Sequence, residues 1–362
     1  MAFSGDGKEY FGIWLNNIFL SIVTAGIYSA WAKVRNKQYF LGHTKILGDG
    51  FGYHATGMQI LKGRLVVLGC LAGFTFLQDF LLMDEELILY LPVLMILFFF
   101  VLYPWAMNKS LAFSARMTSW RTVRFKWHGT FGRTFVYYTL APYLVLLSFG
   151  LAGPWVARKT AEYFVENHSL GTRRLSLSKM SLGRISLTYF LCIMLPFAVL
   201  FASLVLLLGG VVLAAVSTAE NGQFLNWSTE GEELRNLILS GLVEAILILF
   251  IVVIFLSWKL FRLWLLREML RSLQLPDVAR FTSFLDMGKG GWIIVSNLVL
   301  FVLSLGVATP WLMVRYQKYL VETTGVVTSR ELAVFVSAQQ SEQSAIGEGF
   351  TDFESLDFGV GL

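Results

Sequence analysis

The chain has 362 residues, of which 56% are hydrophobic and only 15% are charged. Because a soluble domain carries roughly 25% charged residues, this composition argues against an ordinary soluble protein and indicates one that lies largely in lipid. The formal net charge of +5 would also suit a nucleic-acid-binding protein. Each basic run directly adjoins an apolar stretch, however, so we interpret the bases as marks of membrane orientation and predict no nucleic-acid partner.

Long apolar stretches recur along the chain. About 20 apolar residues cross the hydrocarbon of a bilayer, and seven stretches approach or exceed that length: 10–32, 64–82, 87–106, 131–156, 185–216, 236–258 and 289–313. We therefore predict an all-α polytopic membrane protein with about seven hydrophobic segments.

The connections between these stretches differ in charge. Four are basic, with six Lys or Arg in each: 33–64, 109–133, 158–184 and 259–289. Two are acidic: 84–86 and 220–233. Since cytoplasmic loops carry an excess of Lys and Arg, we predict a multi-pass protein of a bacterial-type inner membrane, with its basic loops in the cytoplasm and anionic lipids as partners.

A repeated motif marks the ends of three stretches. Gly26 to Trp31 matches Gly150 to Trp155 and Gly306 to Trp311, and in each copy a base follows the Trp by four residues and a tyrosine by eight. This spacing places the three side chains along one helix face. Trp suits the headgroup level and a base suits an anionic surface.

We interpret these residues, with two weaker copies, as interfacial anchors or, alternatively, as sites for anionic lipid headgroups. The set is Trp31, Arg35 and Tyr39; Trp155, Lys159 and Tyr163; Trp311, Arg315 and Tyr319; Trp105 and Lys109; Trp258 and Arg262. The matches predict two repeat units, 1–124 and 125–280, and a partial third, 281–337. Residues 338–362 are acidic and Gln/Ser/Gly-rich, which predicts a disordered tail.

If all five Trp–base ends are cytoplasmic, a simple alternation of spans fails. One solution is that the first, fourth and seventh segments enter and leave on one face as re-entrant hairpins. Candidate breaks are Asn16-Asn17, Ala141-Pro142 and Ser296-Asn297, each 13 to 15 residues before the Trp of its own copy. Irregular backbone at this depth lies inside protein or beside water. The alternative is seven ordinary spans with tolerated kinks.

Short strands are expected between the segments. Residues 43–54 have the composition of a hairpin with Gly48-Asp49-Gly50 at its turn. Residues 121–127 alternate bases with apolar side chains, as a strand does, and 333–337 give a weaker strand signal. We expect such strands to form a cytoplasmic cap.

Several stretches resemble the YjgN-like family of bacterial inner-membrane proteins: Gly7 to Asn17, Gly26 to Phe40, Phe51 to Thr56 and Ile60 to Arg64. The resemblance is greatest over 5–66, recurs over 101–165 and extends over most of the chain. The family is one of unknown function, so the resemblance implies an inner-membrane location and a fold type but no catalytic residues. Ala30 departs from the family pattern, which favours Pro before the Trp.

Motifs for catalysis or cofactors are not evident in the sequence. There is no P-loop, dinucleotide fingerprint or nucleophile elbow, and the four histidines have no Cys or carboxylate at ligand spacing. Cys70 and Cys192 both lie within apolar segments. We predict no cofactor and no metal site; an intramembrane enzyme needs only a few polar residues and stays open, but no residue here indicates one.

Two function classes stay open. Glu244 lies within an apolar segment, where an ionisable group is a functional candidate by default. Repeats, breaks and such a residue favour a transporter or channel for a small solute, with Glu244, Asn16, Asn17, Pro142 and Asn297 along the path. The alternative is a non-transporting scaffold that binds anionic lipid or a protein partner through its basic cytoplasmic face.

Overall fold

The computed structural model describes residues 1–82, 89–178, 180–220, 229–329, 332 and 335–338. The acidic connection 84–86 and the expected tail from 339 onward lie outside the described residues. The described residues fall into two compact units. The first holds Met1–Leu182, Arg267–Asp286 and the chain from Ser296, and the second holds Gly183–Leu266 and Met287–Val295.

One order of elements recurs along the described chain: a helix, a returning helix and then strands. Five helical pairs follow this order, and the sequence repeat had suggested two units and a partial third. The pairs are α1 (Gly7–Val23) with α2 (Ser29–His43); α3 (Gly57–Leu81) with α5 (Leu91–Met117); α6 (Phe131–Thr134), η1 (Phe135–Leu140) and α7 (Ala141–Leu147) with α8 (Gly153–Glu166); α9 (Leu182–Glu220) with α10 (Thr229–Ser272); and α11 (Met287–Leu303) with α12 (Thr309–Glu322).

The strands form two antiparallel sheets in chain order. The first sheet contains β1 (Ala2–Phe3), β2 (Thr44–Ile46), β3 (Asp49–Tyr53), β4 (Thr118–Trp120), β5 (Val123–Trp127), β6 (His168–Leu170) and β7 (Arg173–Arg174). The second contains β8 (Ser176–Leu177), β9 (Leu273–Leu275), β10 (Ala279–Ser283) and β11 (Thr324–Thr328). Met1 donates its terminal amine to the carbonyl of Thr324 at 2.8 Å, which ties the start of the first sheet to β11.

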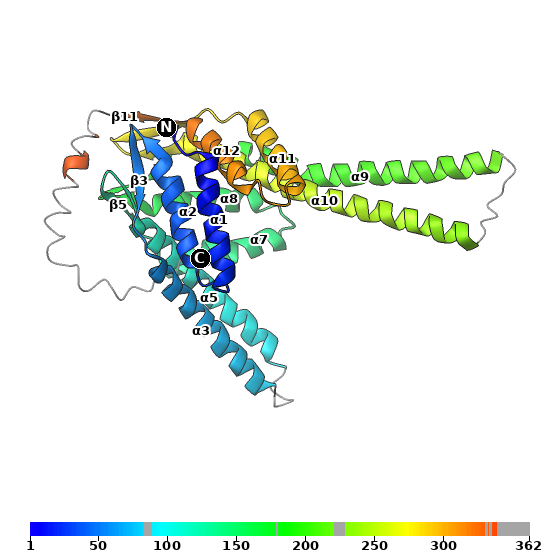
Figure 1. Cartoon of the computed structure of the whole chain (residues 1–362), viewed down its shortest axis with the longest axis horizontal. Coiled ribbons are helices and arrows are strands. Elements are labelled where there is room, and N and C mark those ends of the chain that lie inside the picture. The colour runs from blue at the N-terminus through cyan, green and yellow to red at the C-terminus, as the bar shows by residue number, and fades with distance from the viewer. Residues whose placement is uncertain (83–88, 179, 221–228, 330–331, 333–334, 339–362) are drawn as a thin grey trace. The chain divides into compact units, whose positions relative to one another are not determined.

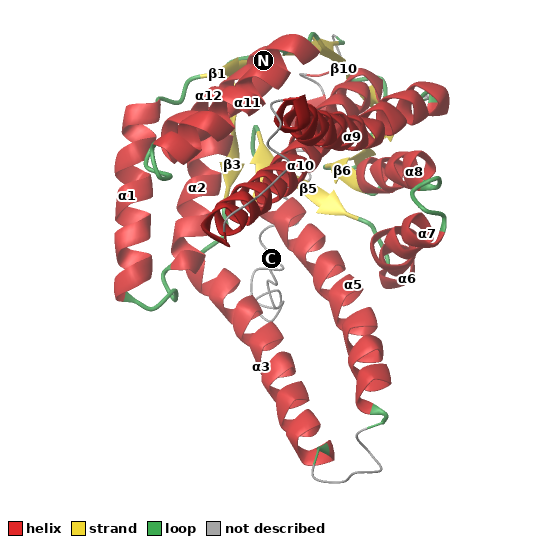
Figure 2. Cartoon of the chain, turned by 90° about the vertical axis from the view of Figure 1, so that its right-hand side faces the viewer, coloured by secondary structure: helices red, strands yellow, loops and turns green. Residues whose placement is uncertain are grey.

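Strand pairing fixes where each helical pair begins and ends. The strand before a pair is hydrogen-bonded to the strand after it in every case: Phe3 with Thr44, Tyr53 with Thr118, Trp127 with His168, Leu177 with Leu273, and Ser283 with Thr324. Figure 2 shows α1 with α2 and α3 with α5 beside the strands that join them. Each helical pair therefore begins at the end of one strand and returns to the end of the strand that is hydrogen-bonded to it.

The two sheets enclose an apolar core. Trp120, Val123 and Leu170 from the first sheet meet Leu275 and residues near it in the second. A cavity of about 220 Å³ remains there, lined almost wholly by apolar side chains. The alternation expected over 121–127 is confirmed, since Val123 is buried whereas Arg124 and Lys126 are exposed.

The other strand expectations have different outcomes. The hairpin over 43–54 is confirmed, but its turn is Leu47-Gly48, both at positive φ, and Asp49 and Gly50 belong to β3. The weak strand signal over 333–337 is wrong, because residues 335–338 are helical. Phe335 and Val336 nevertheless enter the core between the sheets, which explains their apolar character.

The seven hydrophobic segments expected from the sequence differ in the structures that they form. Among the described residues, four helices are long and apolar enough to cross a membrane: Gly57–Leu81, Leu91–Met117, Leu182–Leu213 and Asn236–Ser272. The segments 10–32, 131–156 and 289–313 each fold instead as a helix, a turn and a second helix that begins shortly before the Trp of the repeated motif. We call these three the short pairs; Figure 1 shows the longer α3 and α5.

Two of the three expected breaks are misplaced, and the third, at Ala141-Pro142, coincides with the boundary between η1 and α7. Asn16, Asn17 and Asn297 lie inside the uninterrupted helices α1 and α11, and Pro142 follows the π-helix η1. The first helices end later, at Ala25-Gly26, Phe149-Gly150 and Leu305-Gly306, where both residues have positive φ. Two successive left-handed residues end a helix, and glycine adopts that conformation without strain, whereas a helix tolerates Asn.

Neighbouring pairs pack through a glycine and a tryptophan. Gly57 begins α3, and a Cβ added there would overlap the ring of Trp31 in α2. We expect Gly57→Ala to lower the free energy of unfolding by about 1–3 kcal/mol, because overpacking forces the ring or helix to move. Thermal unfolding in detergent measures this. The matched change Gly69→Ala on the same helix, where nothing lies within 4 Å, should be neutral or stabilising; equal losses in both variants would contradict the packing argument.

Candidate functional site

The tyrosines of the repeated motif fasten the sheet-side ends of the short pairs. Each hydroxyl donates to the carbonyl of the residue that precedes the first helix of its own pair: Tyr39 to Asp6 at 2.7 Å, Tyr163 to Thr130 at 3.4 Å and Tyr319 to Asp286 at 2.5 Å. Tyr39 also accepts from the Asp6 amide at 2.8 Å, and its burial raises its pKa to about 12. These three hydroxyls therefore hold the two helices of each short pair together.

The tryptophans lie at the opposite ends of the same helices. Trp31, Trp155 and Trp311 occupy the first turn of α2, α8 and α12. Trp155 and Trp311 are partly exposed, and the Trp311 ring also stacks on Phe11 of α1 at 4.8 Å. The weaker copies place Trp105 within α5 and Trp258 within α10.

The bases of the three strong copies have partners within their own pairs. Arg35 lies 5.7 Å from the ring centroid of Tyr28, Lys159 bonds Glu162 at 2.8 Å, and Arg315 bonds Ser296 at 3.0 Å and Asn297 at 3.2 Å. Lys109 and Arg262, from the weaker copies, are exposed. A role of any of these bases at lipid headgroups stays a prediction.

The residues predicted to line a solute path are distributed over separate elements. Asn17 is buried and donates to Asn36 of α2 at 3.1 Å, beside a groove of about 430 Å³ between α1 and α2. Asn297 donates to the carbonyl of Leu312 in α12 at 3.2 Å. Asn16 and Pro142 are exposed, and Glu244 is exposed on α10 in the second unit. Asn17 and Asn297 thus each bridge the helices of a different pair.

The four histidines serve local structure. His54 and His128 occupy equivalent places after β3 and β5 and bond Ser119 and Ser169 at 2.8 and 2.9 Å. His43 and His168 bond backbone carbonyls one turn earlier. The described residues contain no group of three or more His, Cys, Asp or Glu that could hold a metal ion.

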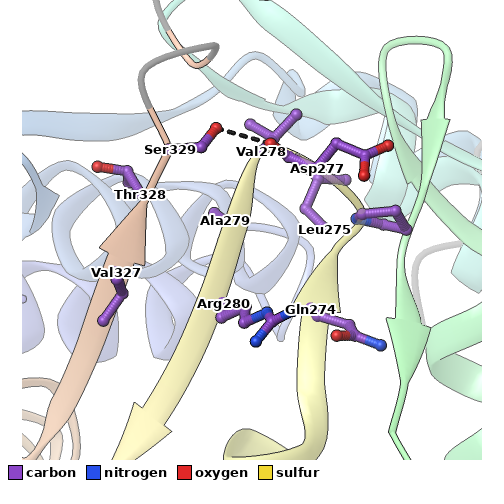
Figure 3. A pocket seen from close by; sticks show the side chains of 10 residues that line it. Gln274, Leu275, Asp277, Val278, Ala279, Arg280, Val327, Thr328 and Ser329 are labelled. Carbon is purple, nitrogen blue, oxygen red and sulfur yellow. Dashed lines mark hydrogen bonds between the residues drawn. The ribbon is translucent and has the colours of Figure 1, made fainter.

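A hollow of about 500 Å³ lies at the β9–β10 turn (Figure 3). Asp277 at this turn has positive φ and pairs with Arg173 at 2.9 Å. The Ser329 amide bonds the carbonyl of Val278 at 2.9 Å, and its hydroxyl bonds that of Asp277 at 2.6 Å. These bonds fasten the end of β11 to the neighbouring hairpin, so we interpret the hollow as structural.

The tips of the short pairs present apolar side chains. Phe149 and Leu305, the left-handed residues at two of the turns, are 98% and 93% exposed. Ile22 and Leu303 near the tips are also exposed. Lone surface apolar residues need no explanation, but because apolar tips recur in three repeated elements we interpret them as a candidate interaction surface.

The backbone amides at each tip are nevertheless hydrogen-bonded. One hydroxyl side chain accepts from the amide four residues later: Thr24 from Tyr28 at 2.9 Å, Ser148 from Ala152 at 2.9 Å and Ser304 from Ala308 at 3.1 Å. The same hydroxyls donate to carbonyls in the last turn of the first helix. We call these three residues the tip hydroxyls.

The tip of the first short pair lies beside a spanning helix. Arg64 in the second turn of α3 donates to the Ser29 hydroxyl at 2.6 Å, and Ser29 begins α2 directly after the tip. Trp31 packs on Gly57 at the start of α3. The tip of α1–α2 is thus level with the first turns of a helix long enough to cross a membrane.

Sequence reasoning missed the tips although a signal was present. Thr24-Ala25-Gly26, Ser148-Phe149-Gly150 and Ser304-Leu305-Gly306 each read hydroxyl, apolar residue, glycine. This three-residue motif ends at the glycine that begins the repeated motif. The breaks were predicted instead at polar residues in the middle of the segments.

Four long apolar helices joined by small antiparallel sheets define an integral membrane protein. The chain belongs to the family described as bacterial protein of unknown function (DUF898), whose model matches residues 1–353. An Escherichia coli O157:H7 protein named Inner membrane protein YjgN is 34% identical over 134 residues, which are 35% of this chain and 30% of that relative.

A second relative of the same name, from Salmonella typhimurium, is 28% identical over 151 residues, or 41% of this chain and 36% of its own length. The matched part of the chain therefore spans about a third of these relatives. No solved structure matches the chain. The family, these relatives and the apolar helices support a bacterial inner-membrane location.

The role of the Tyr39 hydroxyl in holding α1 and α2 together is testable by removing its oxygen. Tyr39→Phe should lower the free energy of unfolding by about 1 kcal/mol or somewhat more, because the hydroxyl both donates to and accepts from Asp6. Thermal unfolding in detergent measures the loss. Tyr143→Phe is the control, since that ring is exposed and packs on Phe100 through its apolar part. An unchanged melting temperature for Tyr39→Phe would refute the stabilising role of this hydroxyl.

Proposed function

We propose that this protein is a non-transporting membrane scaffold of the bacterial inner membrane. Two long helical pairs cross the bilayer, three short pairs insert their tips into the cytoplasmic leaflet, and the sheets form a cap in the cytoplasm. The observation that carries this proposal is the repeated tip, which is apolar outside and has its backbone amides bonded inside.

The lengths of the short helices support partial insertion. The 17 residues of α1 and the 15 of α2 measure about 25 and 22 Å at 1.5 Å per residue, while the hydrocarbon core is about 30 Å thick. Both ends of each short pair are attached to paired strands. Such a pair enters and leaves on one face, as the re-entrant interpretation requires, but it turns at the Gly of the repeat.

The tip hydroxyls lower the free-energy cost of inserting the tips into the membrane. An unsatisfied backbone group in hydrocarbon costs several kcal/mol, and a turn between helices normally exposes such groups. Thr24, Ser148 and Ser304 bond these amides, so the tip can leave water. Burial of its apolar side chains then stabilises the inserted state by about 25 cal/mol per Å².

Charge supports the orientation. Each of the four basic connections contains strands of the sheets, and an excess of Lys and Arg favours the cytoplasmic side. In that orientation the basic ends face the anionic surface of the cytoplasmic leaflet, which attracts each base by about 1 kcal/mol. A basic face beside inserted tips suits a protein that holds anionic lipid or a partner at the membrane.

A solute path is the second candidate. The groove beside Asn17 favours it, because the Asn17 Oδ1 is buried without a hydrogen-bond partner in the described part of the chain. Under this function Asn17→Leu and Glu244→Gln should each change the solute permeability of proteoliposomes. Under the scaffold function, neither variant alters permeability relative to the native protein.

Tip insertion is testable with an environment-sensitive fluorophore. In a protein whose Cys70 and Cys192 are replaced by Ala, single cysteines at Phe149 and Leu305 carry the label in proteoliposomes. We expect blue-shifted emission, quenched by lipids with a spin label in the acyl chain, because both side chains lie in hydrocarbon.

Leu47 provides the matched control for this experiment. It is also an exposed apolar residue at positive φ, but it lies at the β2–β3 turn. A label there should emit as in water and resist quenching. Water-like emission from the Phe149 and Leu305 sites as well would refute insertion of the tips.

A further inference from the structure

Two lysines and an arginine converge beside the tip of the first short pair. Lys33 and Lys37 lie one turn apart on α2, and Arg64 lies in α3, which packs against α2. We propose that these three side chains bind the phosphate of an anionic phospholipid headgroup at the cytoplasmic surface of the membrane. The proposal rests on the membrane placement given above and adds to it a specific ligand site, which we call the Lys33 site.

Two of the cations are held by neutral partners. The Arg64 guanidinium donates to the Ser29 hydroxyl at 2.6 Å, and the Lys37 ammonium donates to the Ser114 hydroxyl of α5 at 3.1 Å. Lys37 also lies 4.9 Å from the ring centroid of Tyr53. Neither Arg64 nor Lys37 is in an ion pair with a carboxylate of the described residues. The hydroxyls thus orient these cations without neutralising them.

The electrostatics of Lys33 agree with this arrangement. Burial, and then the charges of Lys37 and Arg64, lower the pKa of Lys33 to about 8. A lowered pKa means that the surroundings disfavour the ammonium form. A bound anion would oppose the effect of the two neighbouring charges, so Lys37 and Arg64 beside Lys33 favour an anionic ligand at this place.

The repeat shows that folding does not require these cations. At the positions equivalent to Lys33 and Lys37, two and six residues after the Trp, the third pair has Ala157 and Ala161 and the fifth has Met313 and Gln317. Helices α8 and α12 form with these side chains. The charges at the Lys33 site are therefore an addition to the common framework, as expected of a ligand site.

The position of the site selects a phospholipid over other phosphate compounds. Ser29 follows the apolar tip directly, and Arg64 lies in the second turn of a spanning helix. The cations thus lie at the level where hydrocarbon meets the headgroups. A guanidinium matches two phosphate oxygens at once, while lysines act as mobile point charges, so Arg64 would supply the directional contacts to a phosphodiester and the two lysines would add positive charge beside it.

Lipid binding to the full chain tests the proposal. Native mass spectrometry of the detergent-solubilised protein, titrated with dioleoyl-phosphatidylglycerol, gives the dissociation constant of each bound lipid. We expect Arg64→Gln and Lys33→Gln to weaken the tightest site about tenfold, since each removes a charge-assisted bond. Arg64→Lys should lie between these variants and the native protein.

Lys62→Gln is the matched control, because it removes the same charge from an exposed position of α3, two residues from Arg64. Equal weakening by Lys62→Gln, or no weakening by Arg64→Gln in a variant that unfolds at the native temperature, would overturn the proposal. If Arg64→Gln does not fold, Lys33→Gln decides alone.

Two further titrations distinguish an anionic phospholipid from a soluble anion and from a neutral lipid. Titration with inorganic phosphate that gives the same affinity as the lipid, with the same dependence on Arg64, would identify a soluble anion and overturn the lipid assignment. The neutral lipid dioleoyl-phosphatidylcholine should bind without dependence on Arg64. The fluorescence of the Phe149 and Leu305 labels is independent of this assay, so failure of the tips to insert and failure of the Lys33 site give different results.

Discussion

The pairing of strands across each helical pair is the constraint on which the rest of the structure depends. Phe3 pairs with Thr44 and Ser283 with Thr324, so the helices between them must come back to where they began. In the proposed membrane placement, a chain built in this way does not alternate sides at every apolar segment. The basic connections can therefore all lie on one side, which simple alternation of seven spans would forbid.

Each short pair has a different stabilising hydrogen bond at each of its two ends. At the sheet, a tyrosine hydroxyl such as that of Tyr39 closes the pair against the residue before its first helix. At the tip, a side chain such as Ser148 bonds the amide that the turn would leave open. The tyrosine bond fixes the two helices to each other at the sheet. The hydroxyl bond at the tip allows an apolar tip to enter lipid. The proposed Lys33 site lies where the tip of one short pair meets a spanning helix.

Local patterns in the sequence predicted part of this fold. The spacing from Trp31 to Tyr39 identified the repeat, and the alternation around Val123 identified a strand, because both signals depend on residues close together in the chain. The turns were misplaced because Asn17 is polar in an apolar stretch, although its side chain bonds Asn36 within a continuous pair. The Lys33 site was not predictable, since Lys33 and Arg64 are brought together only when α2 packs on α3.

Thiol labelling of single cysteines in sealed right-side-out membrane vesicles tests the central claim most directly. The sites are the strand turns at Leu47, Thr122, Thr172 and Asp277, and the exposed residues Tyr90 and Leu237 near the far ends of the two long pairs. An impermeant reagent should label Tyr90 and Leu237 from outside and reach all four turns only after the vesicles are opened. Labelling of any strand turn in the sealed vesicles would contradict a single cytoplasmic cap.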